Sequence, residues 1–133
     1  MFASNVKAMA AHAIISLLVL FIARRASMIS ITFQIITIGF AWLFYIAFGF
    51  FVLYSANNRL LSVSSVFLIL LIVFIYCLFR GGGDFLIYYG YFNTVCMVPF
   101  SWFGNVGLFI STAIPSLLMY LGMFLRTMYN TKI

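Results

Sequence analysis

Long apolar runs cover most of this chain, and they constrain its fold more than any motif does. Of 133 residues, 67% are hydrophobic and only 6% are charged, whereas soluble domains are nearer to half apolar and about a quarter charged. In lipid, each backbone polar group must find its partner within its own segment, and the runs far exceed the roughly 10 residues of a barrel strand. We therefore predict an all-α integral membrane protein.

Flexible backbone interrupts the apolar sequence most clearly at residues 80–84, which read Arg-Gly-Gly-Gly-Asp and include the chain's single acidic residue, Asp84. The runs on either side are long enough to cross a bilayer, which takes about 20 residues. The polar stretches are too short to fold as a separate water-facing domain. We predict one polytopic membrane domain over residues 1–133 with four transmembrane helices, at residues 8–23, 29–54, 60–79 and 104–125.

The segment 80–103 differs from these runs, because tyrosines, Asn93 and Pro99 lower its hydropathy. We expect it to be an aromatic-rich re-entrant or interfacial segment. The distribution of basic residues favours an alternative in which 85–103 also crosses, which gives five spans and a five-to-two charge bias instead of four to three. Both models place the C-terminus on the cytoplasmic or matrix side, in a bacterial cytoplasmic membrane or an organelle inner membrane.

The lengths of two predicted spans differ from the thickness of the hydrocarbon core, which is about 30 Å. At about 1.5 Å per residue, 8–23 reaches about 24 Å, so we expect its flanking basic residues to snorkel or the bilayer to thin. The run 29–54 would reach about 39 Å, which requires tilt or a bend at Gly39 or Gly49. Trp42, Tyr45 and Tyr54 suit an interfacial aromatic belt.

The net charge of +6 comes from basic residues that flank the apolar runs, singly or as a pair. Such residues anchor helices at anionic headgroups, so we expect membrane lipids and other membrane-protein subunits as partners, and no nucleic acid. Cys77 and Cys96 lie within apolar sequence without metal-ligand spacing, which indicates buried thiols. We expect no metal and no cofactor.

Four polar residues are candidates for a proton or ligand site, and they are His12, Gln34, Arg80 and Asp84. Ionisable groups inside a membrane often mark function. His12 can instead be a neutral imidazole bonded to Ser16 or to a partner helix. Asp84 can pair with Arg80 or cap the segment that follows it.

Small residues at four-residue spacing, Gly107, Ser111 and Pro115, predict a helix-packing stripe in the last span. Pro115 also predicts a bend, because proline lacks the N–H of a helical hydrogen bond. Asn93 and Asn105, like Gln34, are expected to hydrogen-bond between helices.

The sequence lacks the residue combinations of common catalytic sites, since it has no pair of carboxylates and no nucleophile with a base at recognisable spacing. We therefore expect a small non-catalytic subunit of a larger membrane complex in transport or energy transduction, of the respiratory type. One alternative is a self-sufficient oligomeric transporter or lipid-carrier flippase that uses His12, Gln34 and Asp84. Another is a pore-forming holin or toxin.

Overall fold

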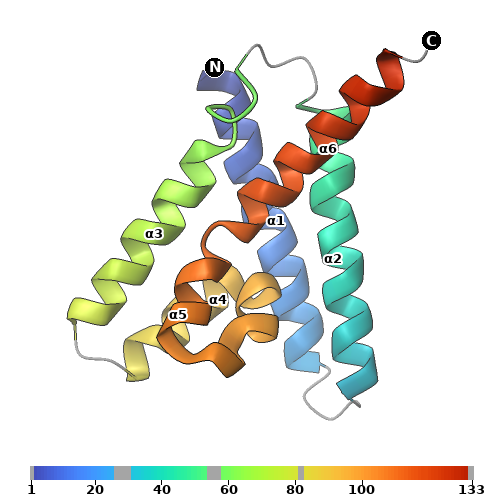
Figure 1. Ribbon diagram of the computed structural model, residues 1–133. Coiled ribbons are helices and arrows are strands. Elements are labelled where there is room, and N and C mark those ends of the chain that lie inside the picture. The colour runs from blue at the N-terminus through green and yellow to red at the C-terminus, as the bar shows by residue number, and fades with distance from the viewer. Residues whose placement is uncertain (1, 26–30, 54–57, 81–82, 132–133) are drawn as a thin grey trace.

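The computed structural model describes residues 2–25, 31–53, 58–80 and 83–131, and within them every regular element is a helix (Figure 1). The prediction of an all-helical chain is therefore confirmed for these residues. In chain order the elements are α1 (Phe2–Arg25), α2 (Ile31–Phe51), α3 (Ser64–Phe79), α4 (Gly83–Phe100), the 3-10 helix η1 (Ser101–Phe103), α5 (Gly104–Ser111) and α6 (Ile114–Asn130).

Two described helices are long and apolar enough to cross a membrane, over Phe2–Ile22 of α1 and Thr32–Phe51 of α2. The pair α5 and α6 is a third candidate if its 41° bend falls within one span. The prediction of four spans is thus confirmed only in part. The predicted run 60–79 gives a helix of 16 residues, about 24 Å long, because its first residues form a turn. In that turn, Ser62 bonds to the Asn58 carbonyl through both its backbone N–H (2.9 Å) and its hydroxyl (2.7 Å).

The first two helices differ in length from the predicted spans. Helix α1 has 24 residues and begins six residues before residue 8, so at about 36 Å it is long enough without thinning of the bilayer. Helix α2 has 21 residues and reaches about 32 Å, which removes the predicted need for tilt or a bend. Residues 54–57, between the predicted spans 29–54 and 60–79, lie outside the described residues.

Helices α2 and α6 cross with their backbones in direct contact at two glycines. A Cβ atom on Gly49 would overlap the carbonyl oxygen of Met119, and one on Gly122 would overlap the carbonyl oxygen of Ile46. Each helix thus presents a glycine to a carbonyl of the other. Gly49, which the sequence suggested as a possible bend, is therefore a contact point within a continuous helix.

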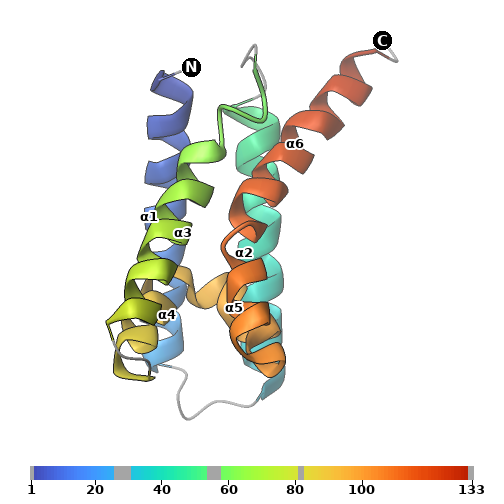
Figure 2. The ribbon, with the colours of Figure 1, turned by 60° about the vertical axis from the view of Figure 1, so that its left-hand side comes forward.

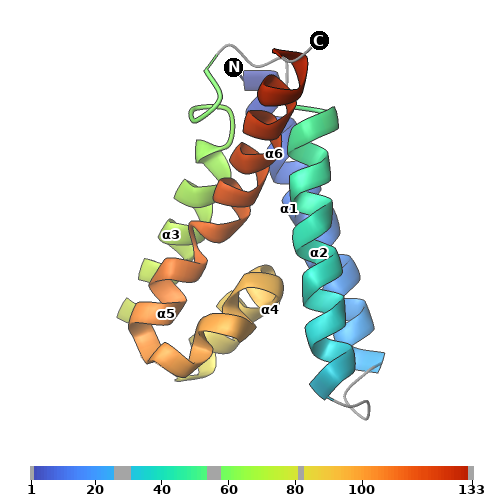
Figure 3. The same ribbon diagram turned by 45° about the vertical axis from the view of Figure 1, so that its right-hand side comes forward.

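Helix α4 is a hairpin with two short arms, since its backbone leaves helical geometry at Asn93 (φ −130°, ψ 27°). The first arm rises into the bundle from the end where α3 finishes, and the second arm returns to that end (Figures 1 and 3). From there η1 leads into α5, which runs back into the bundle. Both arms lie among the other helices, and Tyr89, Val95 and Cys96 are buried.

The bend between α5 and α6 falls at Thr112 and Ala113, just before Pro115. Pro115 occupies the first turn of α6, where its missing N–H leaves no helical bond unmade. The chain therefore bends where the sequence predicted, although two helices replace one kinked helix.

The ends of the chain lie at the same end of the molecule (Figures 1 and 2). Helices α1 and α3 approach each other near this end, where the Asn5 amide nitrogen donates to the Leu61 carbonyl (2.8 Å) and Asn5 Oδ1 accepts from the Ser65 backbone N–H (3.3 Å), and they diverge toward the other end (Figure 1). The C-terminal half of α6 also contacts α2, since the Arg126 guanidinium lies 5.1 Å and the Tyr129 ring 6.4 Å from the centre of the Phe50 ring. The helices present many large apolar side chains outward, including Leu18, Phe44 and Ile72.

Candidate functional site

His12 of α1 and Tyr45 of α2 join these two helices through a hydrogen bond of 2.8 Å between Nδ1 and the tyrosine hydroxyl. The two rings also stack, with centroids 5.9 Å apart and planes inclined by 28°. Tyr45 is fully buried, as is the nearby Ser16 hydroxyl one turn along α1. The hydroxyl donates when Nδ1 carries no proton and accepts when it does. The sequence left open whether His12 bonds to Ser16 or to a partner helix, and the hydrogen bond at Nδ1 is to a partner helix, α2.

Trp42 lies one turn before Tyr45 and ties α2 to the second arm of α4, because its indole Nε1 donates to the Val95 carbonyl at 3.3 Å. The adjacent Cys96 is fully buried and carries a free thiol, as does the buried Cys77. Trp42 and Tyr45 therefore turn into the bundle. Both hold helices together through their polar atoms, and the interfacial belt, which concerns their depth in the membrane, stays a prediction. Its third residue, Tyr54, lies outside the described residues.

A second polar cluster fixes the α4 hairpin to α5. The Asn93 amide nitrogen donates to the Tyr89 hydroxyl at 2.8 Å and to the Ser111 carbonyl at 3.0 Å. The Tyr89 hydroxyl lies 2.8 Å from the Ser111 hydroxyl and 3.1 Å from the Leu108 carbonyl. All of these side chains are buried. Asn93 thus acts as the predicted inter-helix contact at the residue where α4 reverses.

The other polar candidates do not converge on His12. Gln34 is exposed near the start of α2, eleven residues or about 16 Å along the helix from Tyr45. Arg80 is exposed at the end of α3, with its guanidinium 5.9 Å from the centre of the Tyr76 ring. Asp84 falls in the first turn of α4, but its side chain, and hence its predicted pairing with Arg80, lies outside the described part.

The predicted stripe of Gly107, Ser111 and Pro115 is divided by the break between α5 and α6. Gly107 packs so closely on η1 and the end of α4 that a Cβ would overlap the Phe100 carbonyl oxygen. Ser111 belongs to the cluster around Asn93, and Pro115 is buried at the start of α6. These residues therefore pack within the chain, although not on one continuous helix face. Asn105 is exposed instead of bonded between helices.

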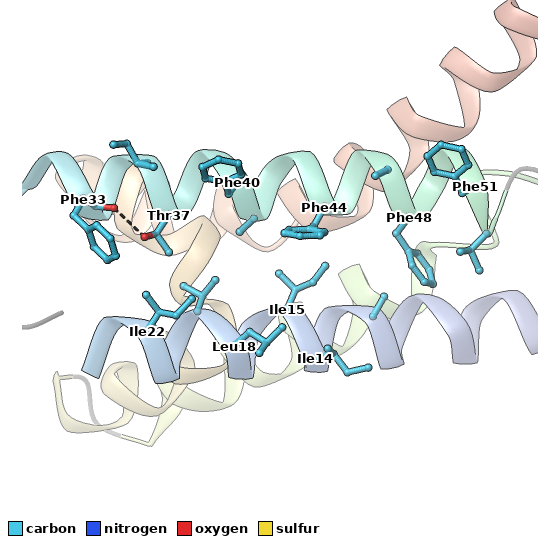
Figure 4. Close-up of a pocket in the computed structure, with 16 residues that line it drawn as sticks. Ile14, Ile15, Leu18, Ile22, Phe33, Thr37, Phe40, Phe44, Phe48 and Phe51 are labelled. Atoms are coloured by element: carbon cyan, nitrogen blue, oxygen red, sulfur yellow. Dashed lines mark hydrogen bonds between the residues drawn. The ribbon is translucent and has the colours of Figure 1, made fainter. Parts of the chain in front are cut away.

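An apolar groove of about 740 Å³ runs between α1 and α2 (Figure 4). Side chains from both helices point into it, and among the described lining residues only Thr37 has a polar side chain. Its hydroxyl donates to the Phe33 carbonyl of the same helix at 2.9 Å. The lining residues are Ala11, Ile14, Ile15, Leu18, Val19, Ile22, Phe33, Ile36, Thr37, Phe40, Ala41, Phe44, Ala47, Phe48, Phe51 and Val52.

The sequence did not indicate the structural roles of Tyr45, Tyr89 and Gly122. The one signal for Tyr45 was that a histidine inside a membrane needs a hydrogen-bond partner. The groove carried a clearer signal, because its residues on α2 recur at steps of three and four from Phe33 to Phe51.

Within the described part, no three His, Cys, Asp or Glu side chains gather as metal ligands would. Comparisons of the chain with protein-family models, curated proteins and solved structures give no match.

Proposed function

We propose that this protein is a small non-catalytic subunit of a larger membrane assembly in transport or energy transduction. One observation carries the proposal: the side chains of His12, Tyr45, Asn93, Tyr89 and Ser111 bond to one another inside the bundle, while the described groove is lined almost entirely by hydrocarbon. His12 bonds to Tyr45, Asn93 to Tyr89 and Ser111. The groove has no polar group that is free to orient a polar substrate. Such a protein contributes helices and lipid contacts instead of an active site.

The exposed faces of several helices support a role among other membrane proteins. Large apolar side chains are exposed on α1, α2, α3 and α6, for example Leu17, Leu43 and Leu121. Lipid can cover such faces, but so can helices of neighbouring subunits, since lipid tails and apolar side chains are similar solvents for them.

The proposed membrane arrangement has four crossings, made by α1, α2, α3 and the bent pair α5 and α6, with α4 re-entrant. Support comes from the two chain ends, which lie at one end of the molecule, and from the α4 hairpin, whose arms enter and leave at the other end (Figures 1 and 3). We place both chain ends on the cytoplasmic or matrix side of a bacterial cytoplasmic or organelle inner membrane.

Cross-linking in native membranes tests the proposal directly. Membranes would be treated with a cross-linker, solubilised in mild detergent and separated by size, and the chains that accompany this protein would be identified by mass spectrometry. We expect a reproducible complex with at least one other membrane protein. A chain that purifies alone and still transports a substrate after reconstitution would contradict the proposal.

The hydrocarbon-lined groove favours one alternative, a lipid-carrier flippase that acts without other subunits. A flippase also needs a polar route for the headgroup, and His12 and Gln34 do not meet. Flux of a fluorescent lipid across proteoliposomes distinguishes the two functions. Activity that is lost when His12, Gln34 and Asp84 are replaced together by Ala or Asn would support the flippase, and absence of flux would support the subunit.

A further inference from the structure

The groove between α1 and α2 opens on the outside of the bundle, and we infer that it is a binding site for the acyl chains of an anionic phospholipid. The site is independent of the proposed function, because a lipid can occupy it whether or not the protein has other subunits as partners. Three properties of the groove lead to this ligand: its apolar lining, the absence of glycine from the described lining, and its length with basic flanks.

The lining selects hydrocarbon over a polar ligand. At about 740 Å³ the groove falls within the range of about 300 to 1,000 Å³ that is usual for ligand sites. Such sites normally hold a few polar groups that orient the ligand, but the Thr37 hydroxyl already bonds within its own helix. Ala11 and Ala41 are buried, whereas Phe40 and Phe44 are exposed, so the groove is deepest over the alanines and flanked by phenylalanine rings.

The lining also favours a flexible chain over a helix. Where this protein packs helix on helix most closely, at α2 and α6, it uses Gly49 and Gly122 to bring the backbones together. Close helix packing in membranes uses small residues, of which glycine allows the closest approach. The described lining of the groove contains no glycine; its small residues are Ala11, Thr37, Ala41 and Ala47, and most of the others are isoleucine, leucine or phenylalanine. A helix about 10 Å wide would be held off by these side chains, whereas an acyl chain can pass between them.

The length of the groove and the charges beside it match a membrane lipid. On α2 the lining runs from Phe33 to Phe51, which is about 27 Å of helix, close to the thickness of the hydrocarbon core. One acyl chain from each leaflet can therefore lie end to end along it. On α1 the lining residues fall between Lys7, which is exposed, and Arg24. Basic residues at both ends attract anionic headgroups.

Photo-cross-linking from the lipid tests the site in the full-length protein. The purified protein would be reconstituted in vesicles of phosphatidylcholine and phosphatidylglycerol that contain a trace of phosphatidylglycerol with a diazirine on its acyl chain. After illumination, labelled residues would be located by peptide mass spectrometry. Leu18, Phe40 and Phe44 should be labelled several-fold more strongly than the exposed Leu68 and Ile72 of α3, which are equally apolar but line no part of the groove.

Filling the groove provides the matched control. Thr37→Trp combined with Ala47→Trp should reduce this labelling several-fold, whereas Ile72→Trp should leave it unchanged, and circular dichroism would verify that each variant keeps its helicity. The same diazirine on phosphatidylcholine should label the groove residues more weakly than on phosphatidylglycerol. In the Lys7→Gln variant, the difference in labelling between the two lipids should be smaller.

Three results would overturn the inference. The first is equal labelling of the groove and the α3 face, and the second is groove labelling that survives both tryptophans. The third is a benzophenone at Phe44 that cross-links to a protein in native membranes instead of to lipid, because that would identify a helix as the occupant.

Discussion

His12 is the only histidine of the chain, and its hydrogen bond to Tyr45 joins two helices that otherwise frame an apolar groove. A polar side chain at membrane depth is expensive unless it is bonded, and the partner must be equally buried for the bond to matter. Tyr45 meets this condition because it is fully buried. At the scale of single residues, the imidazole is therefore a structural link between α1 and α2.

A double-mutant cycle should reveal this link. His12→Phe and Tyr45→Phe each remove one polar partner and keep a ring in place. We expect a coupling free energy of roughly 0.6 to 2 kcal/mol, the range for hydrogen bonds between helices in membranes. The measurement is the free energy of unfolding in mixed micelles titrated with dodecyl sulfate, followed by helicity. Strictly additive single effects would show that the two side chains do not support each other.

Asn93 allows a similar prediction, because its amide connects the turn of the α4 hairpin to Ser111 and Tyr89. Asn93→Leu keeps the size of the side chain but removes the donor, and we expect a loss of about 1 to 3 kcal/mol in the free energy of unfolding. Asn105→Leu is the control, since Asn105 is exposed and should change the unfolding free energy by less than about 0.5 kcal/mol. Equal effects of the two substitutions would remove the structural role assigned to Asn93.

At the scale of helices, the crossing of α2 and α6 determines how the last part of the chain sits on the first. Two glycines, one on each helix, bring the backbones together, and neither leaves room for a methyl group. Dispersion contacts between such surfaces are individually small but numerous, and in lipid they replace the hydrophobic effect as the main attraction between helices.

Glycine-to-alanine substitutions should separate packing from helix propensity. Gly49→Ala and Gly122→Ala force the helices apart, and we expect each to cost about 1 to 3 kcal/mol, as overpacking does elsewhere. Gly39→Ala meets nothing within 4 Å and should be neutral or stabilising by up to about 1 kcal/mol, because alanine favours a helix more than glycine. The same micelle titration measures all three. A Gly39→Ala variant that loses as much stability as Gly122→Ala would show that the crossing is not tight.

How much of this could be read from the sequence depends on whether a feature is local. The apolar helices, the buried thiols of Cys77 and Cys96, and a bend near Pro115 follow from composition and from the position of the proline, and the structure agrees, although the bend separates two helices instead of kinking one. The beginning of α1 does not, because Asn5 is accommodated in the helix by bonds to Leu61 and Ser65, far along the chain. The partners of His12 and Gly122 are likewise set by tertiary packing, which leaves no periodic signal.

At the scale of the whole molecule, the positions of the chain ends distinguish two arrangements in the membrane. In the four-crossing arrangement both ends face one side, and α4 enters and leaves at the other (Figures 1 and 3). If α4 crossed instead, the two ends would face opposite sides, and so would the residues just before and just after α4. The charge distribution favours this five-crossing alternative, whereas the hairpin at Asn93 favours four crossings.

Single cysteines should decide between them in a background with Cys77→Ala and Cys96→Ala. We expect a membrane-impermeant maleimide to modify Ser4→Cys and Asn130→Cys from the same side of the membrane. Arg80→Cys and Trp102→Cys lie at exposed positions that flank α4, and both should be modified from the other side. The pair Arg80→Cys and Trp102→Cys is the more direct test, because these two residues lie on the same side of the membrane only if α4 is re-entrant. Modification of Arg80→Cys and Trp102→Cys from opposite sides would establish five crossings and place Tyr89 and Asn93 of α4 within a true span.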